Sequence, residues 1–150
     1  MTYDISVIGL GYIGLPTAAL FASKGKKVLG VDIDKEVIQN LNKGKIHILE
    51  QDLESMVHMN ITSKHLDLSE KPHKSNVFII AVPTPFILNT KEKEKSPRPD
   101  LSYVKSAVIS ISKFLKKGDL VILESTSPVG TTEKLAGWLA IERPDLSFPN

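Results

Sequence analysis

Short apolar runs alternate along this chain with segments in which apolar residues recur every three or four positions. The runs are rich in valine and isoleucine and predict buried strands, whereas the spaced segments predict amphipathic helices. Strands that alternate with helices indicate β-α-β units and a parallel sheet. The predicted strands are residues 3–8, 27–31, 65–68, 77–82 and 120–124, and the predicted helices are residues 13–24, 35–42, 52–59, 132–141 and a long helix after Asp100 that includes Leu115.

Several elements carry end signals of their own. Pro16 suits the first turn of the first helix, where its missing N–H costs little, and Gly25 suits the end of that helix. Asp100 is the expected N-cap of the long helix. The continuous apolar character of residues 77–82 and 120–124 predicts strands buried on both faces. Residues 86–100 are polar and predict a solvated loop, because lysines alternate with glutamates at residues 91–95 and cancel most of the charge of a phosphate-binding patch.

A glycine motif lies between the first strand and the first helix. Gly9, Gly11 and Gly14 have the spacing G-x-G-x-x-G. The first glycine permits a tight turn, the second lets a pyrophosphate approach the backbone, and the third lets helix and strand pack closely. Asp32 ends the next strand, about 20 residues further on, where a carboxylate can accept the hydroxyls of an adenosine ribose. Its charge would repel a 2′-phosphate and no arginine follows it, so NAD is favoured over NADP.

The predicted fold is α/β, a doubly wound Rossmann-like parallel sheet in the order 3-2-1-4-5 with helices on both faces. Ligands bind such sheets where the strand order reverses, between the first and fourth strands. Thr84 follows the fourth strand and Thr126 follows the fifth, so both are expected beside this crevice. Each hydroxyl has two interpretations of equal weight: a contact to the cofactor or a bridging water, or a cap within a turn.

Composition narrows the function classes. The chain has 150 residues, no cysteine and a formal net charge of +2, with four histidines that show no metal-ligand spacing. This indicates one globular domain at residues 1–150, without a disulfide, a cysteine nucleophile or a metal site. The charge is too small to indicate nucleic-acid binding, and no apolar run approaches the ~20 residues of a membrane helix. We therefore predict a cytoplasmic protein with neither a nucleic-acid nor a membrane partner, and we interpret all four histidines as surface or satisfied residues.

Four segments together resemble the N-terminal part of the UDP-glucose/GDP-mannose dehydrogenase family. The resemblance spans essentially the whole chain, and its last segment, which contains Glu-Ser-Thr-Ser-Pro-Val-Gly, separates this family from other dinucleotide-binding proteins. Two features depart from the family pattern: residues 87–99 form a longer, more lysine-rich loop, and Gln51 stands where proline is common. The matching segments are residues 5–19, 30–34, 81–86 and 121–131.

The resemblance implies a nucleotide-sugar dehydrogenase that oxidises a C6 alcohol to a carboxylate with two NAD⁺ in succession. It implies that the catalytic glutamate and the nucleophilic cysteine lie beyond Asn150, and that the whole enzyme takes a UDP-sugar and forms a homodimer through later regions. The chain alone is expected to bind NAD, to be inactive and to be compatible with a monomer. The family's cofactor-contacting positions correspond to Tyr12, Ile13, Asp32, Thr84 and Thr126, and Thr126 also corresponds to a threonine that helps to position a catalytic water.

Other interpretations stay open. The chain could be a stand-alone NAD-binding or sensing module without catalysis. A different Rossmann enzyme class, such as a methyltransferase, is disfavoured because the third glycine and Pro16 place a helix terminus where a phosphate would bind. Within the family, the sugar stays open, because its contacts are expected in the other half of the enzyme. Glu124, at the end of the fifth strand, is interpreted as structural.

Overall fold

The computed structural model describes residues 2–87, 98–146 and 148. Its centre is a parallel five-stranded sheet in the order β3-β2-β1-β4-β7, which is the predicted order 3-2-1-4-5. Each of the five strands lies within two residues of its predicted position at its start and at its end. The strands are β1 (Tyr3–Ile8), β2 (Val28–Val31), β3 (Leu66–Ser69), β4 (Ser75–Ile80) and β7 (Leu120–Leu123).

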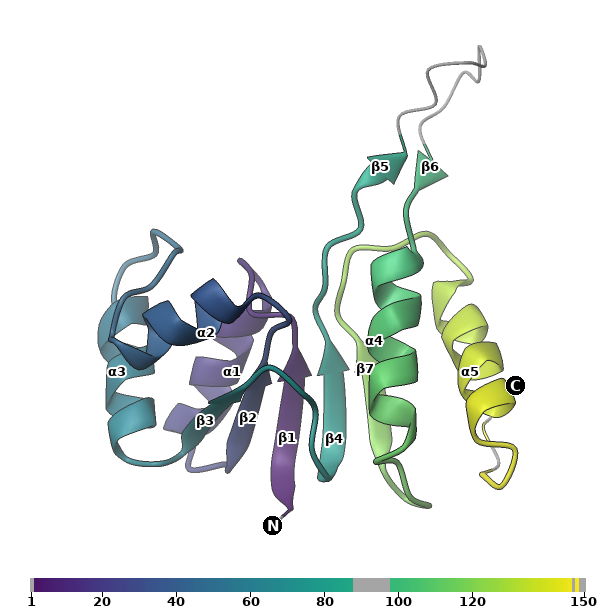
Figure 1. Ribbon diagram of the computed structural model, residues 1–150, viewed down its shortest axis with the longest axis horizontal. Coiled ribbons are helices and arrows are strands. Elements are labelled where there is room, and N and C mark those ends of the chain that lie inside the picture. The colour runs from purple at the N-terminus through teal and green to yellow at the C-terminus, as the bar shows by residue number, and fades with distance from the viewer. Residues whose placement is uncertain (1, 88–97, 147, 149–150) are drawn as a thin grey trace.

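Helices cover both faces of the sheet and form two separate cores, which confirms the doubly wound α/β class (Figure 1). On one face, Leu15 and Val57 pack with Val7 of β1. On the other face, Phe78 of β4 packs with Ile111. The helices of the first face are α1 (Gly14–Ser23), α2 (Lys35–Asn42) and α3 (Leu53–Thr62), and those of the second are α4 (Ser102–Ser112) and α5 (Thr131–Glu142). No helix in the described part of the chain is long and apolar enough to cross a membrane.

The prediction of a loop over residues 86–100 is wrong in part. The two short strands β5 (Phe86–Ile87) and β6 (Arg98–Pro99) pair antiparallel, and they project beyond the carboxyl edge of the parallel sheet (Figure 1). Their pairing joins residues on either side of a polar stretch, so no hydrophobic pattern within either strand announces it. The predicted solvated segment at residues 91–95 lies outside the described residues.

The prediction that the fifth strand is buried on both faces is also wrong. Leu120 is 53% exposed and Ile122 38% exposed, whereas Val121 and Leu123 pack against the core under α4 and α5. The cause is the position of β7 at the edge of the sheet, since α1, α2 and α3 contact β1, β2 and β3. The apolar run therefore showed that the residues of this strand are hydrophobic, but not which elements would pack against each face.

The prediction that Asp100 is the N-cap of α4 is wrong by one residue, because the helix begins one position later. Leu101 occupies the N-cap, and the Asp100 carboxylate accepts a hydrogen bond from the Ser102 backbone N–H at 2.8 Å. Hydrogen bonding to the Ser102 side chain, and secondly to its backbone N–H, lowers the pKa of the Asp100 carboxyl below its usual value. The side chain thus satisfies one of the unpaired N–H groups at the start of the helix, although from a shifted position.

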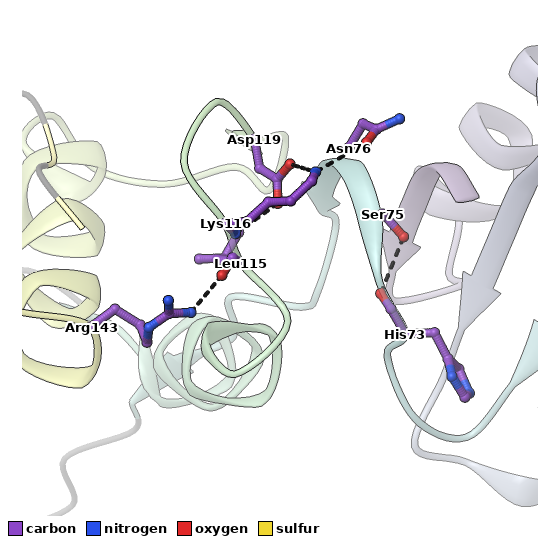
Figure 2. Close-up of polar contacts among 7 residues, drawn as sticks. All are labelled: His73, Ser75, Asn76, Leu115, Lys116, Asp119 and Arg143. Atoms are coloured by element: carbon purple, nitrogen blue, oxygen red, sulfur yellow. Dashed lines mark hydrogen bonds and ion pairs between the residues drawn. The ribbon is translucent and has the colours of Figure 1, made fainter. Parts of the chain in front are cut away.

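Side chains also hold the opposite end of α4, at the amino edge of the sheet. Figure 2 shows the guanidinium of Arg143 pointing at Leu115; it donates to the carbonyl of Leu115 and, at 2.8 Å, to that of Ser112. Ser112 is the last residue of α4, where backbone acceptors lack partners within the helix, and Leu115 lies in the segment that follows. Beside them, Lys116 bridges Asp119 and the side-chain carbonyl of Asn76 (Figure 2). Together these contacts fix α4 against α5 and the starts of β4 and β7.

Candidate functional site

A cavity of about 1270 Å³ opens at the carboxyl edge of the sheet, where the strand order reverses between β1 and β4. The turn after β1, the end of β2, the segments after β4 and β7, and one side of α4 line this cavity. Seven of the eight predicted site residues line it: Gly9, Gly11, Tyr12, Ile13, Asp32, Thr84 and Thr126. Residues separated by more than 110 positions in the sequence are therefore brought to one crevice.

The three glycines of the motif meet different surroundings. Gly9 has φ +96°, and a Cβ there would lie 2.6 Å from the carbonyl oxygen of Ala81. A Cβ on Gly14 would lie 1.8 Å from the carbonyl oxygen of Gly9, so this glycine permits the contact of α1 with the turn. A Cβ on Gly11 would meet nothing within 4 Å. Gly11 thus leaves open the space into which a pyrophosphate could approach the backbone, which fits the predicted role of the loop.

The N-terminus of α1 directs unpaired backbone N–H groups and a partial positive charge toward the same space. The helix begins at Gly14 with Ile13 at the N-cap, and among the described residues no side chain caps it. Leu15 donates its N–H to the Gly11 carbonyl at 3.1 Å, which ties the first turn to the glycine loop. Such a terminus suits an anion like pyrophosphate.

Asp32 has a structural role that the sequence did not predict. Its half-buried carboxylate accepts the backbone N–H of Leu10 on Oδ2 and that of Asp34 on Oδ1, both at 2.9 Å. Each carboxylate oxygen can accept two hydrogen bonds, so both retain capacity for ribose hydroxyls. The residue therefore joins the end of β2 to the glycine loop as well as facing the cavity.

Thr84 and Thr126 contact each other at the carboxyl edge of the sheet. The Thr84 hydroxyl donates to the backbone carbonyl of Thr126 at 2.6 Å. The neighbouring Ser125 donates both its backbone N–H and its hydroxyl to the carbonyl of Ile80 in β4, at 3.1 and 3.2 Å. The Thr84 hydroxyl thus joins the segments after β4 and β7, a long-range contact and not a cap within its own turn, and its oxygen keeps acceptor capacity toward the cavity. A cofactor contact for either threonine stays a prediction.

Two further side chains at this edge, His47 and Glu124, make contacts whose partners the sequence did not predict. His47, from the segment between α2 and α3, lines the cavity, and its Nε2 lies 2.9 Å from the carbonyl oxygen of Leu10. A lone histidine in a loop has no spacing that could have announced this contact. Glu124 accepts the hydroxyl of Thr17 at 3.0 Å, which joins β7 to α1 and agrees with its structural interpretation. Within residues 2–87, 98–146 and 148, no three His, Asp or Glu side chains form a metal-binding group.

Four features together define a dinucleotide-binding domain of the doubly wound class. They are the sheet order, the glycine turn, the uncapped N-terminus of α1 and the carboxylate after β2. More particularly, the chain belongs to the UDP-glucose/GDP-mannose dehydrogenase family, since the model of that family's NAD binding domain matches residues 3–148. The resemblance inferred from the sequence is thereby confirmed, and NAD is the cofactor for which this domain is built.

Individual relatives are similar over nearly the whole chain. UDP-N-acetyl-D-mannosamine dehydrogenase of Campylobacter jejuni is 56% identical over 97% of this chain and 34% of its own length. NDP-N-acetyl-D-galactosaminuronic acid dehydrogenase of Ralstonia nicotianae is 50% identical over 97% of this chain and 33% of its own length. The solved UDP-N-acetyl-mannosamine dehydrogenase of Staphylococcus aureus superposes with a TM-score of 0.86 at 39% identity, over 99% of this chain and 34% of that one. The chain thus spans about a third of the length of these relatives.

Proposed function

We propose that residues 1–150 are the NAD-binding domain of a nucleotide-sugar 6-dehydrogenase whose substrate is UDP-N-acetyl-D-mannosamine. The observation that carries the enzyme class is the crevice in which the open space at Gly11, the N-terminus of α1 and the Asp32 carboxylate face one another. Identity of 56% to the Campylobacter jejuni enzyme supports the sugar. The 50% identity to the Ralstonia nicotianae enzyme supports an N-acetylgalactosamine-type sugar as the second candidate. UDP-glucose, whose dehydrogenase from Pyrobaculum islandicum is 30% identical, has less support.

Different residues of the crevice would hold different parts of NAD. The backbone at Gly11, Tyr12 and Ile13 would hold the pyrophosphate at the positive end of α1. Asp32 would accept the adenosine ribose hydroxyls and repel the 2′-phosphate of NADP. Thr84 and Thr126 would face the nicotinamide end, with Thr126 positioning a water. One NAD⁺ would accept a hydride from the C6 alcohol, and a second NAD⁺ that replaces the resulting NADH would accept a hydride at the aldehyde level.

The chain by itself is proposed to bind NAD without turnover. It contains no cysteine, so it cannot supply the thiolate that would hold an aldehyde-level intermediate. Binding of a UDP-sugar, a homodimeric state and a cytoplasmic location belong to the same proposal for the whole enzyme. Support for them comes from the similarity to longer relatives and from the cysteine-free composition.

Isothermal titration of the 150-residue chain with NAD and NADP, followed by a search for NADH absorbance after adding UDP-N-acetyl-D-mannosamine, tests the proposal. We expect saturable binding of NAD, weaker binding of NADP and no NADH. Absence of NAD binding would refute the cofactor assignment. Formation of NADH by the chain alone would instead refute the proposal that its catalytic groups lie elsewhere.

A further inference from the structure

We propose that His47 is a positioning residue for the pyrophosphate of the cofactor and acts by fixing the Leu10–Gly11 peptide of the glycine loop. His47 comes from the segment between α2 and α3 (Figure 1), and it lines the same cavity as Gly11 and Tyr12. Its Nε2 lies 2.9 Å from the Leu10 carbonyl oxygen. Because a carbonyl only accepts hydrogen bonds, this ring nitrogen carries the hydrogen and donates it. The inference rests on NAD binding in this crevice.

The side chain, the N–H and the carbonyl of Leu10 each have a partner. Its side chain is fully buried and packs over Gly30 of β2, where a Cβ would lie 3.1 Å from it. Its N–H donates to Asp32 at 2.9 Å, and its carbonyl accepts from His47. Asp32 and His47 therefore hold the two polar groups of one residue from two different segments of the chain.

Fixing the Leu10 carbonyl also fixes the next N–H group. In a trans peptide the carbonyl and the following N–H point in opposite directions, and the described part of the chain holds no cis peptide bond. The hydrogen bond from His47 therefore orients the N–H of Gly11, a residue that lines the cavity and at which an added Cβ would meet nothing within 4 Å. Without it, the Leu10 carbonyl loses this hydrogen bond and the Leu10–Gly11 peptide can tilt more easily, because the glycine on one side offers little resistance.

The segment that carries His47 is itself anchored. Ile48, the next residue, is 1% exposed and packs in the core with Leu10 and Leu53. The Lys45 N–H donates to the Asn40 carbonyl at 2.8 Å and ties the start of the segment to the end of α2. The imidazole is therefore presented to the glycine loop from a fixed backbone.

Comparison of NAD with adenosine separates this role from a general structural one, because adenosine has the ribose but no phosphate. For His47→Ala we expect the Kd for NAD to rise about 5-fold, the effect of one lost hydrogen bond, and the Kd for adenosine to stay within about 2-fold. For His47→Gln, whose amide nitrogen can take the place of Nε2, we expect NAD binding to return to within about 2-fold of wild type. His65→Ala is the matched control, because His65 is also exposed, shares one hydrogen bond with Ser63 and lies before β3, at the far edge of the sheet.

Titration calorimetry for NAD and NMR titration for adenosine, with circular dichroism to verify folding, provide the readouts. The inference is wrong if His47→Ala leaves NAD binding unchanged, if it weakens adenosine and NAD equally, or if the glutamine variant binds no better than the alanine variant. A wild-type chain that binds no NAD would overturn the cofactor assignment and this inference with it. A wild type that binds NAD beside an unaffected His47→Ala variant would overturn the inference alone.

Discussion

Replacing Asp32 by alanine should weaken NAD binding and loosen the glycine loop together. The carboxylate accepts the N–H groups of Leu10 and Asp34, each at 2.9 Å, and faces the cavity with capacity for the two ribose hydroxyls. Alanine removes all of these acceptors at once. The variant should therefore lose both affinity and thermal stability.

The expected magnitudes follow from the hydrogen bonds. A bond to a charged acceptor contributes about 1.5–3 kcal/mol, but water replaces part of it at a half-buried group, so a net loss of about 1–3 kcal/mol in NAD binding is expected. This is a rise of about 5- to 150-fold in Kd. Asp32→Asn keeps one acceptor oxygen and loses the charge, so its loss should be smaller. Because the charge is what repels a 2′-phosphate, the ratio of NADP to NAD affinity should rise in both variants.

Titration calorimetry with NAD and NADP, together with thermal unfolding, measures these effects. Asp67→Ala is a suitable control, because Asp67 is also half-buried and accepts one hydrogen bond, from the Tyr3 hydroxyl at 3.0 Å, outside the cavity. The control should lose stability without losing NAD affinity. An unchanged Kd for NAD in Asp32→Ala would refute the role of this carboxylate, and so would an equal loss of affinity in the control.

Two further predictions concern the glycine loop and the end of α4. Gly14→Ala should abolish NAD binding and lower the unfolding midpoint strongly, because its Cβ would lie 1.8 Å from a backbone oxygen. Gly11→Ala should instead fold normally and bind NAD about 10-fold more weakly, because its methyl group fills the open space. Equal losses of stability in the two variants would contradict this prediction. Arg143→Ala should lower the midpoint by a few degrees at neutral pH through loss of the contacts to the end of α4. The hydrogen bond from Arg143 lowers the pKa of Asp145, so the stability from this pair is present above the ordinary value of 3.8 and is lost as the pH falls through the lowered value. Unfolding midpoints measured from pH 7 down to pH 2 should show this acid loss in wild type and not in Arg143→Ala; parallel curves would refute it.

Much of the fold was predictable, because its signals are local. Alternation of apolar runs with helical spacing located the five strands of the parallel sheet, and the crossover rules then left one natural order for them. The glycine motif was predictable for the same reason: a positive φ at Gly9 and a close contact at Gly14 each demand glycine at a single position. The candidate role of Asp32 was predictable from its spacing after the glycine motif and its place at the end of the second strand.

Other features were not predictable, because they depend on neighbours distant in the sequence. The exposure of Leu120 and Ile122 follows from which strands α1 to α3 cover. The pairing of β5 with β6 joins the two sides of a polar stretch that reads as a loop. Similarly, nothing near Thr84 indicates that its hydroxyl would meet the backbone carbonyl of Thr126.

The sequence by itself determined the class of domain, the glycine loop expected to hold the cofactor, and the presence of an acidic residue after the second strand. These depend on backbone conformations and side-chain periods that a few adjacent residues specify. Only the tertiary structure decided that Asp32 and His47 hold the two sides of Leu10, because that contact needs β2 and the segment after α2 to lie beside the same turn. The physical reason is that hydrogen bonds between distant segments are specified by packing, which no single segment encodes.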